Sequence, residues 1–126
     1  MVAAMILDNK VVVVAGVGAG LGRETVRLAL RDGARVVMAA RREEVLAATA
    51  ADLDPGGDRI AWWRTDITDA DQCRALADAA VERFGRIDAV IQVAAFERAF
   101  GRLEETDLQQ WTRAFETNIL GTMTLL

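Results

Sequence analysis

The spacing of apolar positions along the chain changes repeatedly from one end to the other. Short runs rich in β-branched and other apolar residues predict buried strands. Stretches with apolar positions three and four residues apart separate these runs and predict amphipathic helices. The expected strands cover residues 10–15, 34–40, 59–65 and 87–94, and the expected helices cover 20–32, 43–53, 69–84 and about 106–126.

The expected helices have suitable residues at their ends. Gly33 and Gly85 follow two of them, and glycine is common just past a helix C-terminus. Asp69 is a good N-cap for the third helix, and Thr106 or Asp107 begins the last. These residues support the helix boundaries that the apolar pattern predicts.

Strands that alternate with helices predict a parallel sheet built from βαβ units. Right-handed crossovers give the strand order 3-2-1-4 along the sheet, with helices on both faces. This α/β arrangement is a Rossmann-type doubly wound sheet of about four strands. No internal repeat, low-complexity tract or linker divides residues 1–126, so we expect a single domain.

The first predicted strand runs directly into a glycine-rich loop, which leads into the first helix. The loop reads Gly16-Val17-Gly18-Ala19-Gly20-Leu21-Gly22. Glycine lets a ligand approach the backbone without meeting a Cβ. A helix N-terminus presents free N–H groups and the positive end of its dipole. Together they predict a site for a phosphate or pyrophosphate; the alternative is a glycine-rich turn that binds nothing.

Composition and charge narrow the classes of function. The formal net charge is −4, which gives no overall electrostatic case for nucleic acid. The single cysteine, Cys73, excludes an internal disulfide and a cysteine-rich metal site, and we expect it to be a packing residue. No apolar run approaches membrane-spanning length. Residues 1–7 lack the basic region and apolar core of a signal peptide. A cytoplasmic protein with no membrane partner is therefore expected.

Proton donors are scarce in this chain. It contains no histidine and no tyrosine, and Lys10 is its one lysine. Lys10 precedes the first strand, whereas ligands of open α/β sheets bind beyond the carboxyl ends of the strands. We therefore expect Lys10 at the wrong end of the sheet. A general acid or base that works near neutral pH would have to be a carboxylate or Cys73.

The spacing of the loop glycines indicates a family. The loop does not fit the common G-x-G-x-x-G fingerprint. It fits Gly16-x-x-x-Gly20-x-Gly22, which resembles the T-G-x-x-x-G-[IL]-G loop of the short-chain dehydrogenase/reductase family, with Ala15 in place of Thr. The resemblance extends from about residue 11 to residue 126 and implies the N-terminal, cofactor-binding half of a family member. The loop residues that it assigns to the cofactor are Gly16, Gly18, Gly20, Leu21 and Gly22.

The end of the second strand, Ala40-Arg41-Arg42, bears on the choice of cofactor. An acidic residue in this region binds the ribose hydroxyls of NAD, whereas an arginine accommodates the 2′-phosphate of NADP. A guanidinium also binds phosphate through two hydrogen bonds. The pattern resembles NADP(H)-preferring family members, so we expect NADP(H), with NAD(H) as the alternative. A solvated arginine pair is the other interpretation, although arginine at a helix start opposes the dipole.

The third and fourth strands also end in family-like elements. Asp66-Ile67 resembles the Asp-[Val/Ile/Leu] element, which implies that the Asp66 carboxylate meets the adenine amino group and the Ile67 N–H a ring nitrogen. A backbone turn formed by Asp66 is the alternative. Where the family usually reads N-N-A-G, this chain has Gln92, Val93, Ala94 and Ala95. Gln92 then remains as the one bracing amide, and the backbone at Ala94 and Ala95 would line the nicotinamide end.

Asn118 is the one catalytic candidate. Thr117-Asn118-Ile119-Leu120-Gly121 resembles the family's N-x-x-G element, whose Asn carries a water-linked proton relay to the catalytic lysine. A surface amide in a helix is the alternative. The family's catalytic Ser and Tyr-x-x-x-Lys would follow the last helix, and this chain has no counterpart of them. We therefore expect the 126-residue chain by itself to be inactive.

The resemblance implies hydride transfer between NAD(P) and a small-molecule carbonyl or alcohol, and a homo-oligomer in the full-length family member. One alternative is a fragment that binds a nucleotide and catalyses nothing. Another is an S-adenosylmethionine-dependent methyltransferase. The spacing Gly16-x-Gly18-x-Gly20 would suit the glycine loop of such an enzyme. A methyltransferase would be expected to carry an acid after the second strand, so Arg41 and Arg42 argue against it.

The remaining apolar residues are expected to pack. Trp62 and Trp63 would lie on opposite faces of the third strand, and Trp111 on the buried side of the last helix. The fourth strand and the last helix lack the segments that would cover them in the family, so we expect them to be exposed. The predicted face of the first helix carries Leu21, Thr25, Leu28 and Ala29.

Overall fold

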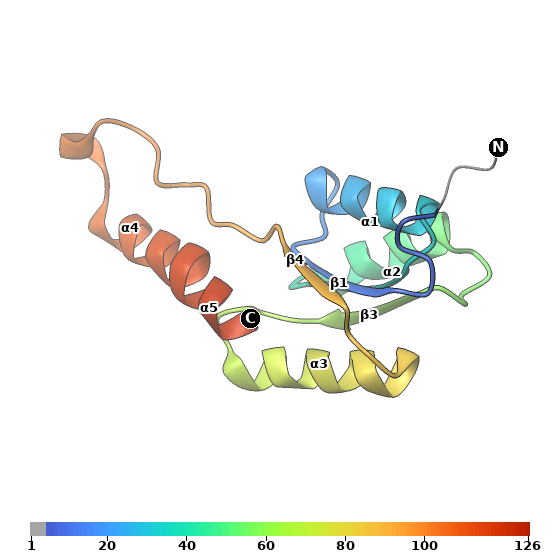
Figure 1. Ribbon diagram of the computed structural model, residues 1–126. Helices are drawn as coiled ribbons and strands as arrows, with labels where there is room; N and C mark the ends of the chain where they lie inside the picture. The colour runs from blue at the N-terminus through green and yellow to red at the C-terminus, as the bar shows by residue number, and fades with distance from the viewer. Residues whose placement is uncertain (1–4) are drawn as a thin grey trace.

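The computed structural model describes residues 5–126, so the first four residues of the N-terminal segment 1–7 lie outside the described part. Its centre is a parallel sheet with the strand order β3-β2-β1-β4, as the sequence predicts (Figure 1). The strands are β1 (Val11–Ala15), β2 (Arg35–Ala40), β3 (Ile60–Arg64) and β4 (Ala89–Gln92).

Helices cover both faces of this sheet. α1 and α2 lie on one face and α3 on the other, while α4 projects away from the sheet (Figure 1). The predicted last helix is present but divided, because a π-helical stretch, η2, separates α4 from α5. No helix in residues 5–126 combines the length and apolarity needed to cross a membrane. The bounds are α1 (Leu21–Arg31), α2 (Glu43–Leu53), α3 (Ala70–Phe84), the 3₁₀ turn η1 (Leu103–Glu105), α4 (Leu108–Phe115), η2 (Glu116–Gly121) and α5 (Thr122–Leu125).

β1 is buried along its whole length because it lies between two strands and under helices on both faces. Successive side chains of a strand point to opposite faces. Val12 and Val14 therefore pack in one core cluster with Val26 of α1, and Val11 and Val13 in a second cluster on the α3 side. A continuous run of valines suits a strand with two buried faces.

The buried face of α1 differs from the predicted one. It is centred on Gly22, Val26 and Ala29, whereas the Leu21 side chain is 71% exposed. Gly22 decides this orientation, since a Cβ there would lie 2.8 Å from Val17 Cα. The helix approaches the loop through the position that has no side chain, and Leu21 is turned outward.

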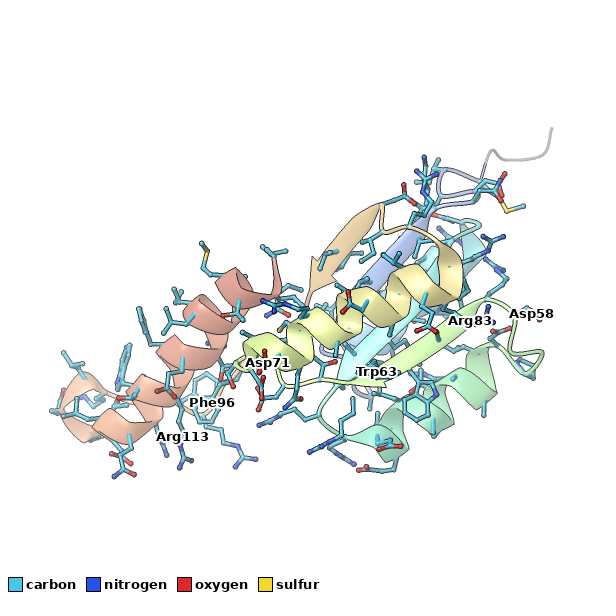
Figure 2. All side chains as sticks on the ribbon, turned by 90° about the horizontal axis from the view of Figure 1, so that it is seen from below. Asp58, Trp63, Asp71, Arg83, Phe96 and Arg113 are labelled. Carbon is cyan, nitrogen blue, oxygen red and sulfur yellow. The ribbon has the colours of Figure 1, made fainter. Side chains whose placement is uncertain are left out.

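The predicted positions of Trp62 and Trp63 are confirmed, and that of Trp111 is not. Trp62 packs against the cluster under α1 and α2, and Trp63 lies on the opposite face beside α3, where it is 46% exposed (Figure 2). Trp111 is 48% exposed, so its predicted burial is wrong. α4 has no buried residue because it projects beyond the sheet (Figure 1).

The ends of α3 follow the sequence prediction. The Asp69 carboxylate accepts hydrogen bonds from the backbone N–H groups of Asp71 (3.0 Å) and Gln72 (3.1 Å), and from the Gln72 side-chain amide (3.0 Å). Gly85 ends the helix in the left-handed region, with φ of 83°. The hydrogen bonds from Gln72 are the main cause of a lowered Asp69 pKa.

Asp69→Ala should therefore lower the urea midpoint of unfolding at pH 7, because two N–H groups at the start of α3 lose their acceptor. A carboxyl whose pKa is depressed by folding stabilises the protein above its unfolded pKa, about 3.9. That stabilisation disappears as the pH falls through the lower folded value. The gap between the wild-type and Asp69→Ala midpoints should shrink below about pH 4. Asp78→Ala, an exposed change within the same helix, is the control; an equal loss there would contradict the cap.

Candidate functional site

A cavity of about 1020 Å³ opens at the carboxyl ends of the four strands. It lies where the strand order reverses beside β1, which is where ligands bind in open α/β sheets. The segments after all four strands contribute to it, and α4 and η2 close its far side. Its lining comprises residues 16–19, 39–42, 65–68 and 93–98, with Val45, Arg113, Glu116 and Thr117.

Two loop glycines are required by the fold itself. Gly16 has φ of 98°, and a Cβ on it would lie 2.7 Å from the carbonyl carbon of Val93. The N–H groups of Gly16 and Val17 both donate to the Ala39 carbonyl, at 2.8 and 3.2 Å. A Cβ on Gly22 would likewise overlap the Gly16 carbonyl. The loop, the start of α1 and the end of β4 are therefore packed backbone against backbone.

Two other loop glycines face open space. A Cβ on Gly18 or Gly20 would meet no protein atom within 4 Å. Gly18 lines the cavity, and Gly20 is the N-cap of α1 without any side-chain cap hydrogen bond. The start of α1 thus leaves its N–H groups available to an anion. Gly20, Leu21 and Gly22 adjoin the cavity without lining it, so their cofactor roles stay predictions.

The two arginines after β2 both line the cavity but differ in their partners. Arg42 Nε donates to Glu44 Oε1 at 2.9 Å. The Arg41 guanidinium forms no ion pair with any residue of the described chain. The Arg41 carbonyl accepts a hydrogen bond from Arg64 Nε at 3.1 Å, which fixes its backbone. Of the two arginines after β2, Arg41 is therefore the one whose guanidinium is free to bind a ligand anion; Arg98 and Arg113 on the far wall likewise form no ion pair within residues 5–126.

Asp66 combines both interpretations drawn from the sequence. Its Oδ1 accepts hydrogen bonds from the Thr68 N–H (3.0 Å) and hydroxyl (2.7 Å), which makes the turn. Within residues 5–126 its Oδ2 has no donor, and Asp66 lines the cavity. The Ile67 side chain is buried beneath Gly121, where a Cβ would lie 3.0 Å from Ile67 Cγ1. The turn thus holds the Asp66–Ile67 backbone at the cavity wall.

Amide side chains fix the wall that follows β4. Gln92 Oε1 accepts from the Ala94 N–H and Gln92 Nε2 donates to the Ala94 carbonyl, both at 2.9 Å. Asn118 Oδ1 accepts from the Phe96 N–H at 2.7 Å, and its Nδ2 donates to the Phe96 carbonyl at 3.1 Å. Ala94 and Ala95 line the cavity as expected from the sequence. Asn118 does not line the cavity, but both polar atoms of its side chain bond the Phe96 backbone, so it is more than a surface amide. Its catalytic role stays a prediction.

Cys73 and Lys10 lie where the sequence places them. Cys73 is 7% exposed, packs in the core cluster beneath α3, and donates its S–H to the Ile67 carbonyl at 3.5 Å. Burial is the main cause that raises the pKa of its thiol, and the charges of Asp69 and Asp66 act in the same direction. The thiol is therefore protonated and inert at neutral pH. Lys10 precedes β1 at the end of the sheet opposite the cavity.

Sequence reasoning missed the far wall of the cavity. Phe96 and Arg113 come together beyond the carboxyl ends of the strands, one from the segment after β4 and one from α4 (Figure 2). Glu97, Arg98 and Glu116 line the same side. No periodic pattern or motif marks these residues, because their meeting depends on the path of the chain out from β4 and back through α4.

The family of the chain follows from comparison with known proteins. A family model described as short chain dehydrogenase matches residues 10–126. The chain belongs to the short-chain dehydrogenase family. Members of this family typically bind NAD(P)(H).

Individual relatives support this assignment. The chain is 33% identical over 115 residues to the uncharacterized oxidoreductase YxnA of Bacillus subtilis, covering 91% of this chain and 32% of that protein. It is 36% identical over 113 residues to cis-4-hydroxycyclohexanecarboxylate dehydrogenase of Sinomonas cyclohexanicum, covering 90% of this chain and 45% of that protein. The chain therefore spans a third to a half of the length of these relatives.

Solved structures show the same fold. A short-chain dehydrogenase/reductase of the glucose/ribitol dehydrogenase type from Brucella melitensis superposes with a TM-score of 0.87 at 31% identity, covering 94% of this chain and 49% of that one. A short chain dehydrogenase from Salmonella enterica serovar Typhi gives a TM-score of 0.89 at 28% identity, covering 99% and 53%. The chain thus has the fold of these solved short-chain dehydrogenases over about half of their length.

Gly18 faces open space and Gly22 is packed, so replacing each by valine should affect different properties of the chain: cofactor binding at Gly18 and stability at Gly22. Gly18→Val should leave the urea midpoint nearly unchanged, because the new side chain meets no protein atom, and should abolish binding of NADPH. Gly22→Val should destabilise the fold by about 3 kcal/mol, the upper range for an overpacked core. Circular dichroism and urea unfolding measure stability, and calorimetry measures binding. Unchanged NADPH affinity in Gly18→Val would mean that the loop is only a turn.

Proposed function

We propose that this chain is the NADP(H)-binding portion of an oxidoreductase that transfers hydride between nicotinamide and a small-molecule carbonyl or alcohol. The observation that carries the proposal is the set of open positions at Gly18 and Gly20, beside the uncapped start of α1 and a free Arg41. The space beside the glycine loop is not filled by protein atoms, and the N–H groups and guanidinium next to it have no anionic partner in residues 5–126.

The cavity suits an extended dinucleotide in its size and in the order of its walls. Its volume of about 1020 Å³ lies at the upper end of the usual range for ligand sites, about 300–1,000 Å³. A pyrophosphate against the glycine loop and α1 would direct the adenosine half towards the ends of β2 and β3. The nicotinamide half would then lie along residues 93–96, beyond β4.

The walls on the adenosine side favour the phosphorylated cofactor. Arg41 would hold the 2′-phosphate through two charge-assisted hydrogen bonds. Arg42 would contribute less because Glu44 already engages its guanidinium. Ala40 has no carboxylate to accept hydrogen bonds from the ribose hydroxyls of NAD. For the same reason, no negative charge at position 40 would repel the 2′-phosphate of NADP.

The relatives support the reaction class. The Sinomonas relative is named for dehydrogenation of a hydroxycarboxylate, which is an alcohol substrate. From this relative we extend only the reaction class to this chain. From the family's N-x-x-G element we propose a role for Asn118 in proton transfer to and from the site. By the same family resemblance we propose a homo-oligomer for the full-length enzyme.

Cofactor choice provides a direct test. The wild-type chain should bind NADPH more tightly than NADH in calorimetric titrations at low ionic strength. Arg41→Ala should reduce this preference by about 1.5–3 kcal/mol, the value of hydrogen bonds to a charged group. Arg42→Ala is the matched control and should have the smaller effect. Equal affinity for the two cofactors in the wild type would contradict the preference, and tighter binding of S-adenosylmethionine would favour a methyltransferase.

Chemistry by the 126-residue chain should be undetectable. A positioned proton donor typically contributes about 10²–10⁴-fold to such reactions. The chain has no tyrosine or histidine, Lys10 lies at the opposite end of the sheet, and Cys73 is buried. We expect no change of nicotinamide absorbance with a panel of ketones and alcohols, even when NADPH is bound. Reproducible turnover by the purified chain would contradict this expectation and point to a carboxylate of the cavity lining, Asp66, Glu97 or Glu116, as the group that transfers the proton.

A further inference from the structure

A hydroxyl group links the Gln92 side chain to the backbone of Asn118 behind the wall that follows β4. Gln92 Nε2, which donates to the Ala94 carbonyl, also donates to Thr122 Oγ1 at 3.1 Å. Thr122 Oγ1 in turn donates to the backbone carbonyl of Asn118 at 2.8 Å. Since Asn118 holds Phe96 by two hydrogen bonds, one network joins both ends of the wall segment to the helix.

We propose that Thr122 is a positioning residue for the nicotinamide half of the cofactor. Its hydroxyl couples the hold of Gln92 on Ala94 to the hold of Asn118 on Phe96, and so sets the position of residues 94–96 relative to the glycine loop. This inference rests on the proposed function, because it assigns the nicotinamide half to this wall. Thr122 lines no part of the cavity and acts through its neighbours.

The geometry around Thr122 makes this position sensitive. The residue begins α5 directly after the π-helical stretch, and Figure 1 shows α5 returning to the end of the sheet where β4 stops. The preceding Gly121 rests on Ile67, which places the helix against the core. At the other end of the network, the Ala94 backbone packs against Gly16, where there is no room for a Cβ. The Ala94 end of the wall is therefore fixed at the glycine loop, whereas the Phe96 end depends on its hydrogen bonds to Asn118.

The network touches only one half of the cavity. The ends of β2 and β3, with Arg41 and Asp66, make no hydrogen bond to Gln92, Asn118 or Thr122. Loss of the hydroxyl should consequently weaken a ligand that carries nicotinamide and spare one that ends at the adenosine half. Adenosine 2′,5′-bisphosphate is the matching probe for that half.

The experiment compares three variants of the 126-residue chain. Thr122→Val removes the hydroxyl with little change in volume, and Thr122→Ser retains it. Thr124→Val is the matched control, because Thr124 makes the same bond to the carbonyl four residues earlier, at 2.8 Å, but lies exposed and does not contact Gln92. Thr122→Val should weaken NADPH about three- to ten-fold and change the affinity for adenosine 2′,5′-bisphosphate less than two-fold (about the noise of the measurement). The other two variants should resemble the wild type.

A measurement without nucleotide tests the network separately from the proposed function. Hydrogen exchange of the Ala94 and Phe96 amides should be faster in Thr122→Val than in the wild type, Thr122→Ser or Thr124→Val. Unchanged exchange would overturn the coupling, whatever the chain binds. Faster exchange with equal weakening of both ligands would overturn the assignment of this wall to nicotinamide. If exchange is faster in Thr122→Val but the wild-type chain binds neither ligand, the network exists and the proposed function is refuted. The role of Thr122 in cofactor binding is then refuted with it.

Discussion

The close approach of three backbone segments at Gly16 and Gly22 is the constraint on which the rest of the structure depends. The end of β1, the start of α1 and the segment after β4 meet where neither glycine has room for a Cβ. This contact brings the helix N-terminus to the carboxyl end of the sheet and turns α1 so that Gly22, Val26 and Ala29 face the core. It also places Ala94 against the loop, so that the glycine turn and the β4 wall form two sides of one cavity.

The polarity of the site follows from that arrangement. A helix start that lacks a side-chain cap, beside two glycines that face open space, leaves unused N–H groups next to the cavity. The starts of α3 and α4, away from the glycine loop, are capped by Asp69 and Asp107, whereas α2, which begins after the cavity residue Arg42, also lacks a side-chain cap. The same contrast separates Arg42, held by Glu44, from Arg41, which has no ion-pair partner in the described chain. The walls after β1 and β2 thus carry unused hydrogen-bonding capacity, and a dinucleotide phosphate would satisfy it.

Sequence reasoning predicted the parts of the structure that depend on local pattern. The strand order, the Asp69 and Gly85 ends of α3, the buried Cys73 and the position of Lys10 all follow from periodicity, capping and the direction of parallel strands. It failed where tertiary geometry decides. Trp111 is exposed because α4 leaves the sheet, and the buried face of α1 is set by the contact at Gly22. The hold of Asn118 on Phe96 joins residues 22 positions apart and could not be read from either segment alone.

The central claim is that the cavity at the switch point of the sheet binds NADPH in an extended orientation. A titration followed by two-dimensional amide NMR of the ¹⁵N-labelled chain tests it most directly. The account predicts saturable shifts at residues 16–22, Arg41, residues 66–68 and residues 94–96. Adenosine 2′,5′-bisphosphate should reproduce all of these shifts except those at residues 94–96. Shifts confined to another surface, or none at millimolar NADPH in a folded chain, would contradict the account.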